Sequence, residues 1–237
     1  MNLLQDLKKD FEKLSNPAKA KLLASFFKTK KGEYGEGDVF LGIVVPKQRE
    51  LVKKYQTLSL SDLQDLLRNT IHEYRLTALF ILVFQYKKAD KNQKQKIVNF
   101  YLKNTKNINN WDLVDLSAHY ILGDFLLEKD KSILYQLVKS KNLWERRISI
   151  MSTFAFIKKD SFGDTLKISE LLLNDQHDLI HKAVGWMLRE IGKRDLKIEE
   201  SFLMKYYQKM PRTMLRYAIE KFEEKKRKFY LTKTSCS

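Results

Sequence analysis

The sequence predicts an all-α fold, arranged as an α-solenoid of two-helix repeats. Apolar residues recur at intervals of three and four positions through most of the chain, whereas no stretch shows the sustained alternation of a strand. Glycine and proline are scarce, with 8 and 3 among 237 residues, and this favours long helices joined by short connections. The third observation is that short segments of similar character recur along the chain, as expected of a repeat architecture.

The expected helices follow from start signals and from apolar spacing. Residues 1–14 are amphipathic and charged, which is typical of a surface helix and argues against a secretory signal peptide. Each of the three prolines, Pro17, Pro46 and Pro211, is expected at a helix start, and residues 31–38 are expected to form an ordered loop. Further helical spacing is shown by Leu76, Leu79, Phe80 and Val83 and by Leu113, Leu116, Tyr120 and Phe125.

The chain contains no internal low-complexity linker, and we therefore expect a single repeat domain over residues 1–230. The basic run that begins at Lys225 is expected to lead into a basic, frayed tail over residues 231–237. The only cysteine, Cys236, has no partner for a disulfide or a cysteine metal site within the chain.

Five short segments can be set in register, with small and apolar residues after a charged one. Their first residues follow at intervals of 40, 32, 35 and 34, close to those of HEAT and tetratricopeptide repeats. These register positions are Arg75, Asp115, Arg147, Lys182 and Arg216. The alternative is a chance alignment of amphipathic helices, which commonly begin with charged residues.

The charge balance indicates a polyanionic partner: nucleic acid, an acidic membrane surface or an acidic protein. Lysine and arginine number 45 against 29 aspartates and glutamates, for a net charge of +16. No stretch approaches the roughly 20 apolar residues that span a bilayer, so we expect no membrane partner. Without an export signal, the cytoplasm is the expected compartment.

Asp115 is the one anion among the register positions, and Trp111 lies four residues before it, on the same face of a helix. A surface that holds phosphates has no electrostatic use for a carboxylate, so we interpret Asp115 as stabilising positive charge on a sugar. The alternative is a core tryptophan beside a surface aspartate. Trp186 follows Lys182 by four residues and shares its face, whereas Trp144 is expected to anchor a helix start.

Other chemistry is not indicated. None of the four histidines has a cysteine partner or the glutamate motif of zinc peptidases, and no nucleophile elbow, Walker A loop or dinucleotide fingerprint occurs. We therefore expect neither a metal nor a cofactor.

Over nearly its whole length, the chain resembles a known family, the AlkD-like DNA alkylation repair glycosylases. The resemblance is carried by segments 35–46, 111–115, 144–147, 181–190 and 211–219, which include Trp-Asp-x-x-Asp and Gly-Trp-x-Leu-Arg-Glu. It implies a right-handed α-solenoid of HEAT-like two-helix repeats with a concave basic face. It also implies a monomeric, monofunctional enzyme that removes 3-alkyladenine and 7-alkylguanine from duplex DNA without flipping the base into a deep pocket.

Carried over by motif, the resemblance implies that Trp111, Asp115, Arg147 and Trp186 act together. Asp115, Trp111 and Trp186 would be catalytic, and the expected DNA contacts are Arg147, Lys182, Arg75, Arg189, Arg212 and Arg216. One departure is the pair 109–110, two asparagines where some members have another aromatic residue. Two alternatives stay open: a catalytically silent DNA-binding repeat protein, and a solenoid adaptor that recognises an acidic protein.

Overall fold

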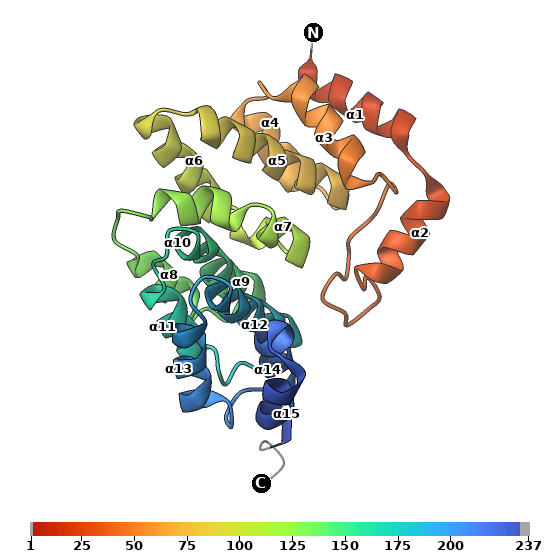
Figure 1. Cartoon of the computed structure of the whole chain (residues 1–237). Helices are drawn as coiled ribbons and strands as arrows, with labels where there is room; N and C mark the ends of the chain where they lie inside the picture. Colours follow the sequence, from red (N-terminus) through yellow and green to blue (C-terminus); the bar gives the residue numbers. More distant parts are fainter. Residues whose placement is uncertain (1, 233–237) are drawn as a thin grey trace. The chain divides into compact units, whose positions relative to one another are not determined.

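The computed structural model describes residues 2–232, and this part of the chain consists of helices, turns and loops (Figure 1). The only β-type pairing among these residues is an isolated bridge between Val39 and Ile71. The predicted all-α class is confirmed. The chain divides into two compact units, residues 1–117 and residues 118–237, and the expected domain over 1–230 includes parts of both.

Unit 1 carries the N-terminal helices. It contains α1 (Leu3–Leu14), α2 (Pro17–Phe26), α3 (Val45–Tyr55), α4 (Leu60–Leu67), α5 (His72–Lys88), α6 (Lys91–Lys103), the 3-10 turn η1 (Thr105–Asn107) and α7 (Trp111–Asp115).

Unit 2 continues the helical chain. It contains the π-helical turn η2 (His119–Gly123), α8 (Ser132–Leu137), α9 (Leu143–Ser152), α10 (Phe154–Ile157), α11 (Gly163–Leu171), α12 (Asp178–Gly192), α13 (Leu196–Tyr206), α14 (Arg212–Ala218), the 3-10 turn η3 (Ile219–Lys221) and α15 (Glu224–Thr232).

The helices begin where the sequence carries start signals. Pro17 and Pro46 occupy the first turns of α2 and α3, and Pro211 directly precedes α14, so all three predicted starts are confirmed. Ser59 and Asp62 form a reciprocal capping box at the start of α4. The apolar spacing of residues 113–125 is divided between α7 and η2, so it does not form one helix as the spacing suggested.

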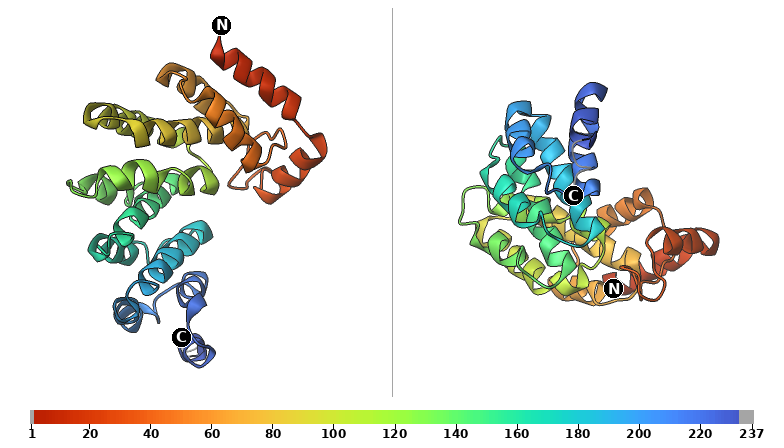
Figure 2. Two further views of the ribbon diagram at one scale, coloured as in Figure 1. Left: turned by 45° about the horizontal axis from the view of Figure 1, so that its top comes forward. Right: turned by 90° about the horizontal axis from the view of Figure 1, so that it is seen from below.

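Helix α5 is central among the helices of unit 1 (Figures 1 and 2), and most of its residues are buried. It packs beside α3, α4 and α6, and the loop before α3 is tied to it by Glu73. The buried Glu73 carboxylate accepts hydrogen bonds from the backbone N–H groups of Leu41, Gly42 and Ile43 at 2.8 to 3.1 Å. This anchor fixes the loop against the start of α5, where the candidate site begins.

Helix α12 holds the same place in unit 2, where it packs against α9, α13 and α14. Its contact with α14 is close because of Gly185. A Cβ atom added there would lie 2.3 Å from the carbonyl oxygen of Met214 and 2.5 Å from the Cβ of Tyr217. The glycine of the Gly-Trp motif therefore allows α12 and α14 to approach each other.

The C-terminal expectation needs a correction. The basic residues after Lys225 are helical, since α15 runs through Thr232 and buries Tyr230 against neighbouring aromatic rings. Of the tail expected over 231–237, residues 233–237 lie outside the described residues. No helix between residues 2 and 232 is long and apolar enough to cross a membrane.

We expect Gly185→Ala to lower the free energy of unfolding by about 1–3 kcal/mol, because the added methyl group meets backbone atoms that cannot move aside. Gly163→Ala is the matched control, since a Cβ atom there meets nothing within 4 Å. Thermal melts of the two variants test this, and equal melting temperatures would contradict the close-approach explanation.

Candidate functional site

The Trp-Asp-x-x-Asp motif forms α7, a helix of only five residues. The side chain of Asn110 starts this helix by accepting a hydrogen bond from the N–H of Trp111 at 2.8 Å. Asn110 is fully buried, and its Nδ2 donates to Asp38 Oδ2 at 3.3 Å. The asparagine that departs from the family pattern thus caps α7 and ties it to the loop before α3.

Trp111 and Asp115 lie one turn apart on the half-buried face of α7, while the three residues between them are buried. The Trp111 ring stacks on Phe27 with 5.2 Å between ring centroids and 16° between planes, and meets Phe26 edge-on at 6.0 Å. Phe27 in turn stacks on Phe40 at 5.1 Å. Trp111 is therefore neither a fully buried core residue nor a loose surface ring, but one held on an aromatic stack.

A buried ion bridge lies beneath this stack, at the start of α5. The Nδ1 of His72 lies 3.0 Å from Asp38 Oδ2, and its Nε2 lies 2.8 Å from Asp112 Oδ2. Burial by itself would lower the pKa of His72, but the charge and hydrogen bond of Asp112 and the hydrogen bond to Asp38 raise it to about 9. The bridge thus holds an imidazolium ion between two carboxylates at neutral pH.

Arg75 belongs to the same cluster. Its Nη2 lies 2.6 Å from Asp38 Oδ1, and its Nη1 donates to the carbonyl oxygens of Asn69 and Thr70. Burial would raise the pKa of Asp38, but the hydrogen bond from His72 and the charge of Arg75 lower it. Arg75 is only 3% exposed, so its placement favours an internal role over the DNA contact expected from the sequence.

The other register positions hold equivalent places in their own helices. Each is the fourth or fifth residue of a helix: Arg75 in α5, Asp115 in α7, Arg147 in α9, Lys182 in α12 and Arg216 in α14. This regularity supports the repeat interpretation over chance alignment. Their exposure differs, however, because Arg216 is exposed and Lys182 is half-buried, whereas Arg147 is 4% exposed.

In unit 2, one face of α12 combines a cation with an indole. Lys182 pairs with Asp178 at 2.6 Å, and the indole Nε1 of Trp186 donates to Glu190 Oε1 at 3.0 Å. The Trp186 ring lies 6.1 Å from Phe154, whose own ring carries the ammonium group of Lys158 at 4.3 Å. The predicted sharing of one helix face by Lys182 and Trp186 agrees with their equal, intermediate burial.

The remaining predicted DNA contacts lie in the same unit. Arg147 donates to the carbonyl oxygen of Leu179, next to the start of α12. Arg189 pairs with Glu220 and with Glu190, and the exposed Arg212 donates to the carbonyl oxygen of Leu231 at 2.7 Å. Trp144 is buried in the first turn of α9, as expected of a helix anchor.

Sequence reasoning missed the ion bridge and the aromatic stack. The available signal was limited to Asp38 and Asp112, two ionisable residues within the segments that carry the family resemblance, because His72 lies outside those segments. His72 and Asp112 each stand three residues before a register position, but the register does not say which side chains meet, so only the folded chain reveals the contact.

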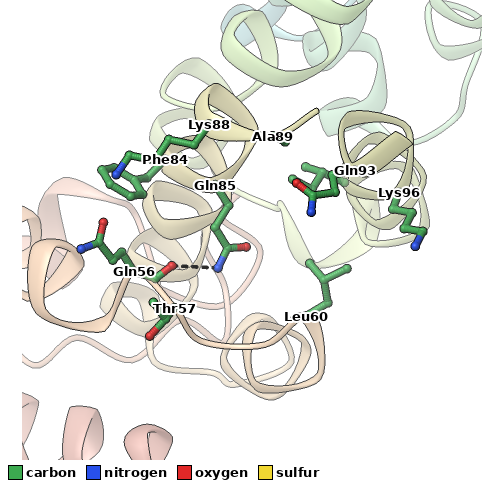
Figure 3. A pocket seen from close by; sticks show the side chains of 10 residues that line it. Gln56, Thr57, Leu60, Phe84, Gln85, Lys88, Ala89, Gln93 and Lys96 are labelled. Carbon is green, nitrogen blue, oxygen red and sulfur yellow. Dashed lines mark hydrogen bonds between the residues drawn. The ribbon is translucent and has the colours of Figure 1, made fainter. Parts of the chain in front are cut away.

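A separate pocket of about 550 Å³ lies in unit 1 near the ends of α3, α5 and α6, with Leu60, Phe84 and Ile97 among its apolar lining residues (Figure 3). It contains none of the predicted site residues. Within residues 2–232, no group of three or more histidine, cysteine, aspartate or glutamate side chains could hold a metal ion.

The ion bridge makes stability depend on pH in a defined direction. Because His72 has its pKa raised from 6.5 to about 9, its stabilising contribution is fully present below pH 6.5 and is lost as the pH rises through 9. We expect the difference in unfolding free energy between the wild type and His72→Gln to shrink by on the order of 3 kcal/mol between pH 6 and pH 10. Denaturant unfolding at both pH values tests this.

Glu199 also titrates in this range, since burial raises its pKa to about 8, but it does so equally in both proteins. A difference in stability that does not change with pH would mean that His72 is neutral in the folded state.

Comparisons with known proteins give a family and a shared fold. No curated protein matches the chain significantly. A solved structure described as a predicted DNA alkylation repair enzyme from Enterococcus faecalis is similar, with a TM-score of 0.69 and 18% identity over 89% of this chain and 97% of that chain. AlkD2 from Streptococcus mutans gives a TM-score of 0.54 and 16% identity over 86% of this chain and 97% of its own.

A third structure, smu.31 from Streptococcus mutans UA159, gives a TM-score of 0.50 and 16% identity over 99% of this chain and 98% of that chain. At these identities the solved structures show a shared helical fold. The family assignment comes from the sequence model described as DNA alkylation repair enzyme, which matches residues 7–222. This chain therefore belongs to the DNA alkylation repair enzyme family.

Proposed function

We propose that this protein is a monofunctional DNA glycosylase that hydrolyses the N-glycosidic bond of positively charged N3- and N7-alkylated purines in duplex DNA. The observation that carries the proposal is the pair Trp111 and Asp115, an indole and a carboxylate one turn apart on a half-buried helix face in a protein of net charge +16. Membership of the DNA alkylation repair enzyme family supports it.

Asp115 would act on the sugar and not on the base. Alkylation at N3 or N7 already makes the purine a cationic leaving group, so no strong general acid is needed. As the bond breaks, positive charge grows on the deoxyribose, and a carboxylate beside it stabilises that charge and holds the attacking water. The face of Trp111 would favour a cationic sugar by roughly 0.5–2 kcal/mol, and Trp186 is proposed as a further catalytic indole.

The basic side chains would position the duplex. Lys182 would hold a phosphate next to the lesion and so fix the register of the sugar, with Arg189, Arg212 and Arg216 as further contacts. Arg147 is only 4% exposed and donates to the carbonyl oxygen of Leu179, so it would support the start of α12 beneath these contacts. We propose that these groups line a concave basic face of a right-handed solenoid, and that the base is not flipped into a deep pocket. The enzyme would work as a monomer, without a metal or other cofactor.

A catalytically silent DNA-binding protein is the second candidate, because the positive charge alone would bind a duplex. Asp115→Asn separates the two. For a glycosylase, we expect release of 7-methylguanine to fall by about 10²–10³-fold, because the stabilising carboxylate is lost. DNA affinity should be kept or increased, since a negative charge leaves a basic surface. Single-turnover release of free base and a fluorescence-anisotropy titration measure the two quantities.

The matched control is Asp65→Asn, which removes the same charge from an exposed position on α4. We expect this variant to match the wild type in base release. Wild-type protein that binds methylated duplex DNA and releases no base would favour the silent binding protein.

Substrate preference provides a second test. If selectivity comes from the positive charge of the lesion, duplexes containing 7-methylguanine or 3-methyladenine should lose the base, whereas uracil should be released at least about 10³-fold more slowly. Chromatography of the released bases measures both rates under the same conditions. Comparable rates for uracil and 7-methylguanine would contradict the proposed mechanism.

A further inference from the structure

We propose that His72 is a positioning residue for the Trp111 and Asp115 pair: bridged between Asp38 and Asp112, it fixes the start of α7 and thereby the direction of both side chains. The inference deepens the proposed function and rests on it. His72 itself would touch neither DNA nor water, since it is only 2% exposed.

Helix α7 needs such an anchor because five residues form too few internal hydrogen bonds to stabilise a helix on their own. Its side-chain anchors lie at the N-terminal end. Asn110 connects to Asp38, and Asp112 accepts from the ring of His72 at 2.8 Å and from the N–H of Leu113 at 2.8 Å. Asp112 thus joins the backbone of α7 directly to the His72 ring.

The ring also supports Trp111 from a second side. The imidazole stacks on Phe40 at 4.6 Å and 21° and lies 4.9 Å from Phe27, and Phe27 carries Trp111 on its own stack. The buried His72 ring is therefore linked to the backbone of α7 through Asp112 and to the indole of Trp111 through Phe27. Movement of His72 would change both together.

The charges of the cluster explain why a histidine is suited to this position. The groups that face it are the carboxylates of Asp38, from the loop before α3, and Asp112, from α7, and the guanidinium of Arg75, from α5. Two anions and two cations balance only while His72 carries its proton. A neutral residue would leave a buried carboxylate without its counter-charge, and such groups are strongly destabilising.

Small displacements matter for the proposed reaction. A shift of about 1 Å in a positioned catalytic group can cost on the order of 10²-fold in rate, while substrate binding is hardly affected. A positioning role for His72 therefore predicts a loss in the chemical step, with DNA affinity unchanged.

The test uses His72→Gln in the full-length protein, labelled with 5-fluorotryptophan. The resonances of Trp111, Trp144 and Trp186 are assigned by Trp→Phe substitution, and ¹⁹F NMR then reports the surroundings of Trp111 whether or not the protein is active. The matched control is Thr77→Val, on the same helix α5, which loses a buried hydrogen bond to Gln48 of α3.

For His72→Gln we expect a selective shift of the Trp111 resonance and at least a 10-fold slower single-turnover release of 7-methylguanine, with a Kd for DNA within 2-fold of the wild type. In the double variant His72→Gln/Asp112→Asn, the neutral amides can form a hydrogen bond with each other. We therefore expect the Trp111 resonance and the rate of base release to return partly to their wild-type values. Thr77→Val should lower the Tm without changing the Trp111 resonance or the rate of base release.

A normal rate and an unmoved Trp111 resonance in His72→Gln would overturn the proposal, as would equal losses in Thr77→Val. If His72→Gln does not fold, the double variant decides: recovered stability without recovery of the Trp111 signal overturns the proposal. If the wild type releases no base, the proposed function fails, and the ¹⁹F shift alone still tests the positioning of Trp111.

Discussion

The buried bridge from Asp38 through His72 to Asp112 joins a loop, the start of α5 and the start of α7. The imidazolium is the counter-charge of Asp112 and shares Asp38 with the guanidinium of Arg75, and these pairs matter because a buried charge without a partner is costly. The bridge accounts for the internal position of Arg75, for the fixed start of a five-residue helix and for the aromatic stack that holds Trp111. The candidate catalytic pair depends on these contacts.

The two aspartates of the Trp-Asp-x-x-Asp motif have different environments, although they lie on the same short helix. Asp112 is buried and accepts hydrogen bonds from His72 and from the backbone. Asp115 shares the half-buried face with Trp111. The motif thus supplies an internal anchor, Asp112, and a carboxylate on the half-buried face, Asp115.

In unit 2 the candidate site residues are held in place by close helix packing, whereas in unit 1 they are held by buried ion pairs. Gly185 lets α12 approach α14 closely, and the same turn of α12 carries Lys182 and Trp186. A larger residue would separate the helix that bears the indole from the helix that bears Arg212 and Arg216. Close packing therefore sets the spacing between the indole and these two arginines within this unit, just as the ion bridge sets the position of Trp111 in the other.

The sequence by itself determined the helical class, the proline-marked helix starts, the repeat register and the shared face of Trp111 and Asp115, because each depends on residues only a few positions apart or on a fixed period. It did not reveal the burial of Arg75 or the continuation of α15 through Thr232, since both depend on what packs against a residue. Only the tertiary structure decided that Asn110 connects α7 to Asp38 and that His72 bridges two carboxylates. Those contacts join residues 34 to 72 positions apart, and no local pattern encodes such distances.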